Sequence, residues 1–88
     1  NVQSSKLVQR VDPRYPELAK RARVQGLVLL QVTVGELGTV TDIKVIRGHP
    51  LLTQAALDAV RQWRYSPTLL NGEPVPVLAT VTVNFVLR

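Results

Sequence analysis

Hydrophobic and polar residues alternate along three stretches of the chain, over residues 27–34, 40–47 and 77–87. A period of two is typical of strands that bury one face, so each stretch predicts a β-strand. The two glycines of the segment 35–38 predict a tight hairpin between the first two strands. In the last strand, one face carries Thr80, Thr82 and Asn84, and the buried face carries Ala79, Val81, Val83 and Phe85.

Two other stretches have the spacing of helices. In the first, Pro16 suits the first helical position and Gly26 is expected to end the helix. A second, longer amphipathic helix is predicted from residue 51 to Tyr65 and places Trp63 on the sheet. Between this helix and the last strand, residues 66–76 contain three prolines and an Asn-Gly pair, which predict an irregular connection. The expected apolar stripe of the first helix comprises Leu18, Ala19 and Ala22.

The order of elements is helix, strand, strand, helix, strand. A crossover through the second helix returns the last strand beside the first strand, so the predicted sheet order is second, first, third. Asp42 and Lys44 give the second strand a charged outer face, which is typical of an edge strand. We therefore expect an α+β fold: a two-layer domain with a three-stranded antiparallel sheet and two helices on one face.

The last strand is an edge without the usual protection. Charged residues make up 19% of the chain, but there is none from Val75 to Leu87. Edge strands are commonly blunted by lysine, proline or a bulge, since their unpaired backbone groups otherwise pair with a further strand. Three occupants are open at this point: the segment Lys6 to Val11 of the same chain, a second copy of the domain, or a peptide of a partner protein.

Charge and composition narrow the function only slightly. The net charge of +5 suits nucleic acid, an anionic membrane surface or an acidic partner, but most basic residues are scattered, as on a solvated surface. RNA-binding sheets need exposed aromatic rings, whereas Trp63 and Phe85 are assigned to the core. Nucleic-acid binding is therefore the least favoured function. No stretch of about 18 apolar residues predicts a membrane span.

The residues that catalysis or metal binding would need are missing or dispersed. The chain has no cysteine, one histidine and six separated acids. His49 stands in a predicted loop, and Asp58 is assigned to the outer face of the second helix, so a catalytic triad is not expected. The pattern predicts no enzyme activity, no catalytic residues, no metal site and no cofactor.

Several motifs together resemble the C-terminal domain of the TonB family, the energy transducers of the Gram-negative envelope. The most specific are the Tyr15-Pro16 pair and the stretch Trp63-Arg64-Tyr65-Ser66-Pro67, supported by "VQGLVLLQVTV", "GTVTDIKVIRG" and "NGEPVPV". The resemblance extends from Val11 to Leu87. It implies a TonB-like domain over 11–88, preceded by an extension over 1–10 that is flexible or covers the edge strand.

The resemblance also implies partners and a location. Such a domain lies in the periplasm, is anchored to the inner membrane by an upstream segment, and is driven there by the proton-channel complex. It binds the TonB box of outer-membrane transporters by adding it as a strand, and transmits mechanical energy for nutrient uptake. By position, the implied partner-binding residues are Arg10, Asp12, Tyr15, Pro16, Thr82, Val83, Asn84, Phe85, Val86 and Leu87.

Two observations bear on the residues and the function that the resemblance implies. Well-known members of the family have glutamine where this chain has Asp12, so the accepted box sequences are expected to differ. TonB-like domains also occur on envelope sensors and membrane peptidases, which makes a partner- or ligand-sensing module the alternative function. Since the chain starts with Asn1 rather than Met, we expect it to be part of a longer protein, whose upstream sequence would separate the two.

Overall fold

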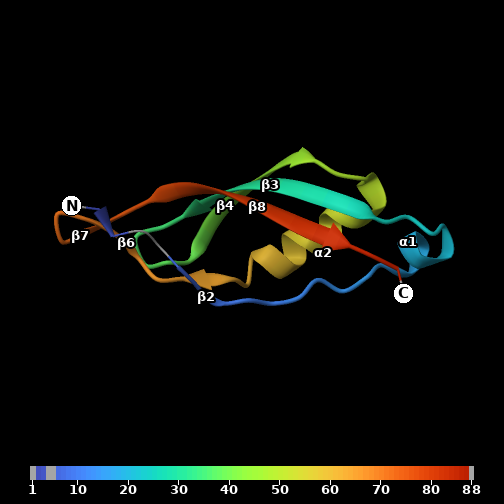
Figure 1. The fold of residues 1–88 in the computed structure, drawn as a ribbon, viewed down its shortest axis with the longest axis horizontal. Coiled ribbons are helices and arrows are strands. Elements are labelled where there is room, and N and C mark those ends of the chain that lie inside the picture. Colours follow the sequence, from blue (N-terminus) through green and yellow to red (C-terminus); the bar gives the residue numbers. More distant parts are fainter. Residues whose placement is uncertain (1, 4–5, 88) are drawn as a thin grey trace.

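The computed structural model describes residues 2–3 and 6–87, so the predicted extension over 1–10 and domain over 11–88 include four residues outside this range. Its centre is a three-stranded antiparallel sheet (Figure 1). β3 (Gly26–Val34) lies between β4 (Val40–Arg47) and β8 (Val77–Phe85). The predicted strand order is confirmed.

Two helices lie on one face of this sheet, as predicted. α2 (Pro50–Val60) packs along β3 and β4, and the short α1 (Glu17–Arg21) lies at the end of the sheet where β3 starts (Figure 1). We call the opposite face, which bears the side chains of Leu27 and Leu29, the outer face. The core between the layers contains Val28, Leu30, Val32, Val34, Leu52, Ala56, Val60, Trp63, Val81, Val83 and Phe85.

The second helix ends earlier than its sequence pattern predicts. It starts at a cap formed by His49, whose Nδ1 accepts a hydrogen bond from the Leu51 N–H at 3.1 Å. It ends at Val60 rather than Tyr65, and Trp63 reaches the core from the following turn. The prediction that Arg64 and Tyr65 end the helix was wrong, because they form β5 (Arg64–Tyr65), which pairs with β2 (Leu7–Gln9).

The first helix is also shorter than predicted. Its C-terminus closes with hydrogen bonds from Val24 N–H to the Ala19 carbonyl and from Arg23 N–H to the Lys20 carbonyl. Arg23 has φ 55°, so this is a Schellman arrangement with arginine in the left-handed position. Gly26 therefore does not end the helix but begins β3. Within the expected apolar stripe only Ala19 is buried, and Leu18 is 65% exposed.

Residues 66–76, predicted to be irregular, form a second small sheet. β6 (Thr68–Leu70) and β7 (Glu73–Val75) make a hairpin, and β1 (Val2–Gln3) pairs with β6. Asn71 and Gly72 have φ values of 51° and 84°, as a two-residue hairpin turn requires. This hairpin extends from one end of the main sheet, so the molecule measures 50 × 21 × 17 Å (Figure 1).

The predicted turn over 35–38 is confirmed and contacts β5. The Gly35 N–H donates to the Thr39 carbonyl, and the Tyr65 N–H donates to the Gly38 carbonyl, both at 2.8 Å. Gly38 has φ 84°, and a Cβ atom there would lie 1.9 Å from the Tyr65 carbonyl oxygen. A glycine is therefore required at this position by both conformation and space.

Candidate functional site

The two edges of the main sheet differ in charge and regularity. The β4 edge carries Asp42, Lys44 and Arg47, and its pairing with β3 is interrupted by two register shifts. β8 pairs with β3 without interruption from Val77 to Phe85 and has no charged residue. Within the described part of the chain, no strand pairs with the other side of β8. The unprotected edge predicted from the sequence is therefore at β8.

Hydrogen bonds near the β3–β4 turn determine which backbone groups of β8 point outward. The Gly35 N–H donates to the Thr39 carbonyl beside β4, and the Thr33 carbonyl accepts from the Thr41 hydroxyl. The backbone N–H and C=O groups of the odd-numbered residues of β3 therefore point towards β4. The N–H and C=O groups of successive residues point to opposite sides of a strand, so those of the even-numbered residues of β3 point towards β8. Their partners in β8 are odd-numbered, from Val77 opposite Val34 to Phe85 opposite Gly26.

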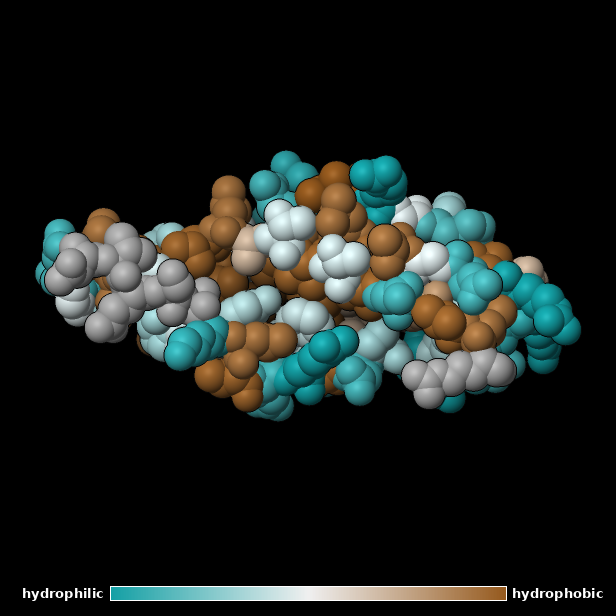
Figure 2. All heavy atoms as spheres, viewed as in Figure 1, coloured by the Kyte–Doolittle hydropathy of each residue, from teal (hydrophilic) through white to brown (hydrophobic). Residues whose placement is uncertain are grey.

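The N–H and C=O groups of the even-numbered β8 residues consequently point away from the sheet. We call this row, formed by Leu78, Thr80, Thr82 and Asn84 and continued by Val86, the open edge. The side chains of the open edge lie on the outer face and are exposed. In Figure 2 the surface over β8 is mostly brown and white, with few teal residues, which fits its lack of charge.

Five of the six predicted strand residues fall into two groups. Thr82, Asn84 and Val86 present outward backbone groups. Val83 and Phe85 are 4% and 3% exposed, and their backbone groups face β3. The structure therefore assigns them to the core rather than to a contact surface.

Leu87, the last of the predicted strand residues, is held by Gln25, a residue that no sequence motif marks. Its N–H donates to the side-chain oxygen of Gln25 at 3.0 Å. This bond points towards the start of β3, in agreement with the phase of the pairing along β8. Gln25 therefore keeps the chain aligned with β3 beyond Phe85, where the strand itself ends.

Tyr15 contacts the end of β8 from the helical side, and Pro16 precedes α1. The Tyr15 ring meets the Phe85 ring edge to face, with centroids 5.5 Å apart and planes at 87°. The Tyr15 hydroxyl donates to the Val24 carbonyl, and Pro16 occupies the N-cap position of α1 without a side-chain capping hydrogen bond. Both residues are half-buried. The contacts of Tyr15 are structural and position Phe85 relative to the segment that enters β3.

Arg10 and Asp12 lie apart from the open edge, beside Trp63. They form an exposed ion pair at 3.4 Å, and the Arg10 guanidinium lies 5.6 Å from the centre of the Trp63 ring. The indole N–H of Trp63 donates to the Val11 carbonyl at 2.9 Å. Exposed ion pairs contribute little to stability, so the indole hydrogen bond is the firmer link between this segment and the core.

The N-terminal segment does not occupy the open edge. β2 pairs with β5, where Leu7 is opposite Tyr65 and Gln9 is opposite Arg64. Two more hydrogen bonds join Lys6 and Ser66: the Lys6 N–H donates to the Ser66 hydroxyl, and the Ser66 N–H donates to the Lys6 carbonyl, each at 2.8 Å. The structure places residues 6–9 at β5, so the segment 6–11 is not the strand that covers β8.

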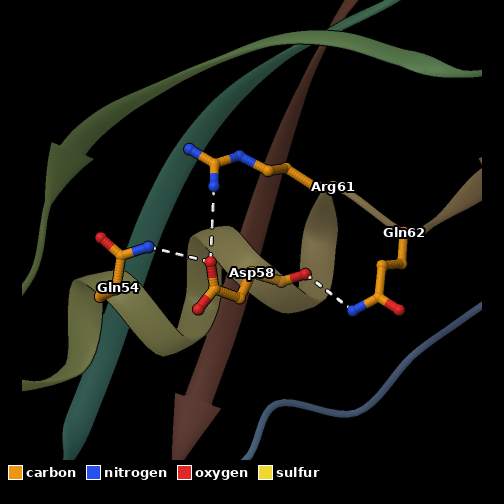
Figure 3. Close-up of polar contacts among 4 residues, drawn as sticks. All are labelled: Gln54, Asp58, Arg61 and Gln62. Atoms are coloured by element: carbon orange, nitrogen blue, oxygen red, sulfur yellow. Dashed lines mark hydrogen bonds and ion pairs between the residues drawn. The ribbon is translucent and has the colours of Figure 1, made fainter.

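A groove of about 470 Å³ separates residues 11–17 from α2. On its α2 side, an Asp58 carboxylate oxygen accepts from Gln54 at 2.9 Å and from Arg61 at 3.4 Å (Figure 3). The Gln62 side chain donates to the Asp58 backbone carbonyl at 3.0 Å. Each of these contacts joins residues three or four positions apart on the exposed surface of α2 and of the turn that follows it, and such contacts stabilise a helix. Among residues 2–3 and 6–87, no group of three potential ligands could hold a metal ion.

The sequence matches a known family over almost its full length. The profile of the family described as "Gram-negative bacterial TonB protein C-terminal" matches residues 11–87. Protein TonB of Xanthomonas campestris pv. campestris (strain B100) is 40% identical over 78 residues, which cover 86% of this chain and 35% of that protein. Protein TonB of Vibrio cholerae is 31% identical over 81 residues, which cover 90% of this chain and 33% of that protein.

The fold matches as well. The solution NMR structure of the Pseudomonas aeruginosa TonB CTD superposes with a TM-score of 0.78 at 26% identity, covering 96% of this chain and 87% of that one. The chain spans about a third of the length of the curated relatives that it matches. In the part of the chain that the structure describes, no helix has the length and apolar character needed to cross a bilayer.

Proposed function

The chain belongs to the family of Gram-negative TonB C-terminal domains, and from this premise we propose that it binds the TonB box of outer-membrane transporters at the open edge of β8. The box would add as a further strand to the sheet. The domain would thereby act as a binding and force-transmitting module of an energy transducer for nutrient uptake, without catalysing a reaction.

The observation that carries this proposal is the set of unpaired backbone groups along β8. Each even-numbered residue from Thr80 to Val86 directs one N–H and one C=O outward, and each hydrogen bond to an added peptide contributes about 0.5–1.5 kcal/mol net. The alternate residues are anchored in the core, so the edge is rigid before a peptide arrives. A preformed edge lowers the entropic cost of binding.

The attachment of the N-terminal segment supports the force-transmitting role. A pull from the N-terminal side would first load the pairing of β1 with β6 and then the two hydrogen bonds between Lys6 and Ser66. It would next reach the β2–β5 pairing and the indole of Trp63. Trp63 lies in the same core as Val81, Val83 and Phe85. A pull at the N-terminal segment would therefore reach β8 through packed side chains and without a flexible hinge.

The location and the remaining partners follow from the same proposal. The domain would lie in the periplasm, and upstream segments would anchor it to the inner membrane and connect it to the proton-channel complex. The open edge would also accept β8 of a second copy, giving a strand-paired homodimer in the absence of a box. Arg10 and Asp12 would contact the partner outside the added strand, since they lie beside Trp63 and not on β8.

An NMR titration tests the proposal. A synthetic peptide with the TonB box of a TonB-dependent transporter is added to isotope-labelled protein. We expect the largest amide shifts at Thr80, Thr82, Asn84 and Val86, because their N–H groups gain an acceptor. A peptide of the same composition in scrambled order is the control. Shifts concentrated on β4, near Lys44, or equal shifts with the scrambled peptide would contradict the proposed site.

A further inference from the structure

A β-bulge in β4 determines where Arg47 lies. Val45 is opposite Leu30, but Arg47 is opposite Leu29, so Ile46 is an extra residue in the ladder. In a ladder without the bulge, Ile46 would lie opposite Leu29 and Arg47 would turn to the helix-covered face. Bulges often re-aim a side chain at a functional surface. Here the bulge brings a guanidinium onto the outer face of the sheet.

The re-aimed arginine borders an apolar hollow. Arg47, Leu27, Leu29 and Thr82 line a depression of about 510 Å³ on the outer face. Leu27 is 57% exposed, and Leu78, further along the same face, is 66% exposed. Among residues 2–3 and 6–87, Arg47 forms no ion pair. The outer face thus combines uncovered leucine side chains with an uncompensated cation.

The charges on the two sides of the molecule are compensated to different degrees. Three of the six acids, Asp12, Glu17 and Asp58, line the groove between residues 11–17 and α2 together with Arg14, and Asp12 and Asp58 form ion pairs with Arg10 and Arg61. On the outer face, Lys44 lies opposite Gln31 and Arg47 opposite Leu29, whereas Asp42 is the one acid paired across that face, opposite Thr33 near the β3–β4 turn. The end of the outer face that contains the hollow is therefore apolar and cationic.

We propose that the outer face docks on an anionic phospholipid surface. Leu27 would insert at the boundary between the head groups and the acyl chains, and Arg47 would pair with a lipid phosphate. Apolar side chains together with cations are the features that favour anionic membrane surfaces. No aromatic side chain of the described strands lies on this face to stack on bases, which disfavours a nucleic acid.

Lipid docking is independent of peptide binding. The backbone groups of the open edge point away from β3 within the plane of the sheet, whereas the hollow opens perpendicular to that plane. A peptide added to β8 would therefore lie beside the lipid surface and would not replace it. Failure of either proposal leaves the other intact.

Vesicle flotation tests the inference. Wild-type protein is mixed with vesicles of phosphatidylglycerol and phosphatidylcholine in equal parts, or of phosphatidylcholine alone. We expect binding to the anionic vesicles only. Arg47→Gln should weaken binding about fivefold, the contribution of one cation near such a surface. Leu27→Ser should weaken it about tenfold through lost apolar contact. Arg61→Gln, an equal change of charge at the exposed C-cap of α2, is the matched control and should retain binding.

A second measurement does not depend on any variant. With a paramagnetic lipid in anionic bicelles, the amide signals of residues 27–29 and 47 should be attenuated more than those of Gln54 and Asp58. Equal attenuation on both sides, equal losses in Arg47→Gln and Arg61→Gln, or no flotation with anionic vesicles would overturn the inference. Displacement from the vesicles by an unrelated oligonucleotide at moderate salt would also overturn it, in favour of a nucleic-acid surface.

Discussion

The side-chain oxygen of Gln25 accepts a hydrogen bond from the backbone N–H of Leu87 at 3.0 Å, across 62 positions of sequence. This contact joins the residue before β3 to the segment after β8. It keeps Val86 extended, with its backbone groups directed outward, so the open edge is one residue longer than the strand. A glutamine that touches no partner thereby contributes to the length of the proposed binding surface.

Replacement of Gln25 should shorten the open edge. Gln25→Leu removes the acceptor of the Leu87 N–H, and we expect affinity for a TonB-box peptide to fall about three- to tenfold, equivalent to one or two backbone hydrogen bonds. Calorimetric titration gives the affinity, and the peptide-induced shift of the Val86 amide should vanish. Gln25→Glu keeps an acceptor and should restore both. An unchanged Val86 shift in Gln25→Leu would refute the assigned role.

Proline at an outward position should block peptide binding without breaking the sheet. The Asn84 N–H points away from β3, so Asn84→Pro removes a donor of the open edge and leaves the β3–β8 ladder its hydrogen bonds. We expect at least a tenfold loss of peptide affinity and a circular dichroism spectrum close to that of the wild type.

Asn84→Ala is the matched control for this proline variant. It removes the side chain but retains the N–H, so peptide affinity should remain within about twofold of the wild type if backbone pairing dominates. A comparable loss in both variants would mean that the amide side chain, and not the backbone, carries the recognition.

Two glycines with the same backbone conformation should differ in their tolerance of alanine. Gly38 and Gly72 both have φ 84°, but a Cβ at Gly38 meets the Tyr65 carbonyl at 1.9 Å, whereas Gly72 has no atom within 4 Å. Gly72→Ala should lower the free energy of unfolding by about 1–2 kcal/mol, the cost of the left-handed conformation. Gly38→Ala should cost clearly more, as measured by urea unfolding. Equal costs would show that the β3–β4 turn moves away from β5 easily.

Tyr65 should make stability sensitive to alkaline pH. Burial raises the pKa of the Tyr65 hydroxyl above its model-peptide value of 10.0. The folded state therefore retains this proton to a higher pH than the unfolded state. The contribution of the protonated Tyr65 hydroxyl to the free energy of unfolding is fully present below pH 10 and is lost as the pH rises through the folded-state pKa. Urea unfolding of Tyr65→Phe should show a shallower decline of stability above pH 10 than the wild type. Identical slopes in the two proteins would refute this contribution.

The regular elements of the fold were predictable because their patterns are strong and local. Alternation over 27–34 and 77–85 identified β3 and β8, and the two glycines near residue 36 identified the turn between β3 and β4. The pairing of Arg64 and Tyr65 with β2 was not predictable, since it depends on a segment more than 50 residues away. Helical periodicity simply continues through these residues, and long-range pairing overrides it.

For the candidate site, the sequence indicated which strand forms the uncharged edge, but not which of its residues direct their backbone groups outward. The absence of charge selects β8, but which of Thr82 and Val83 points its backbone outward depends on the hydrogen-bonding phase set by β3. Side-chain polarity carries no information on that phase by itself. Gln25 likewise has no sequence signal, because its role arises from a contact with the far end of the chain.

The difference between the two sheet edges limits the size of any assembly built on them. β4 is closed to further pairing by its bulges and by Asp42, Lys44 and Arg47, whereas β8 is open along its outer side. The main sheet therefore offers one edge for strand addition. A peptide or a second copy that joined β8 would use that edge, so the main sheets of successive copies would have no second open edge through which to grow into a filament.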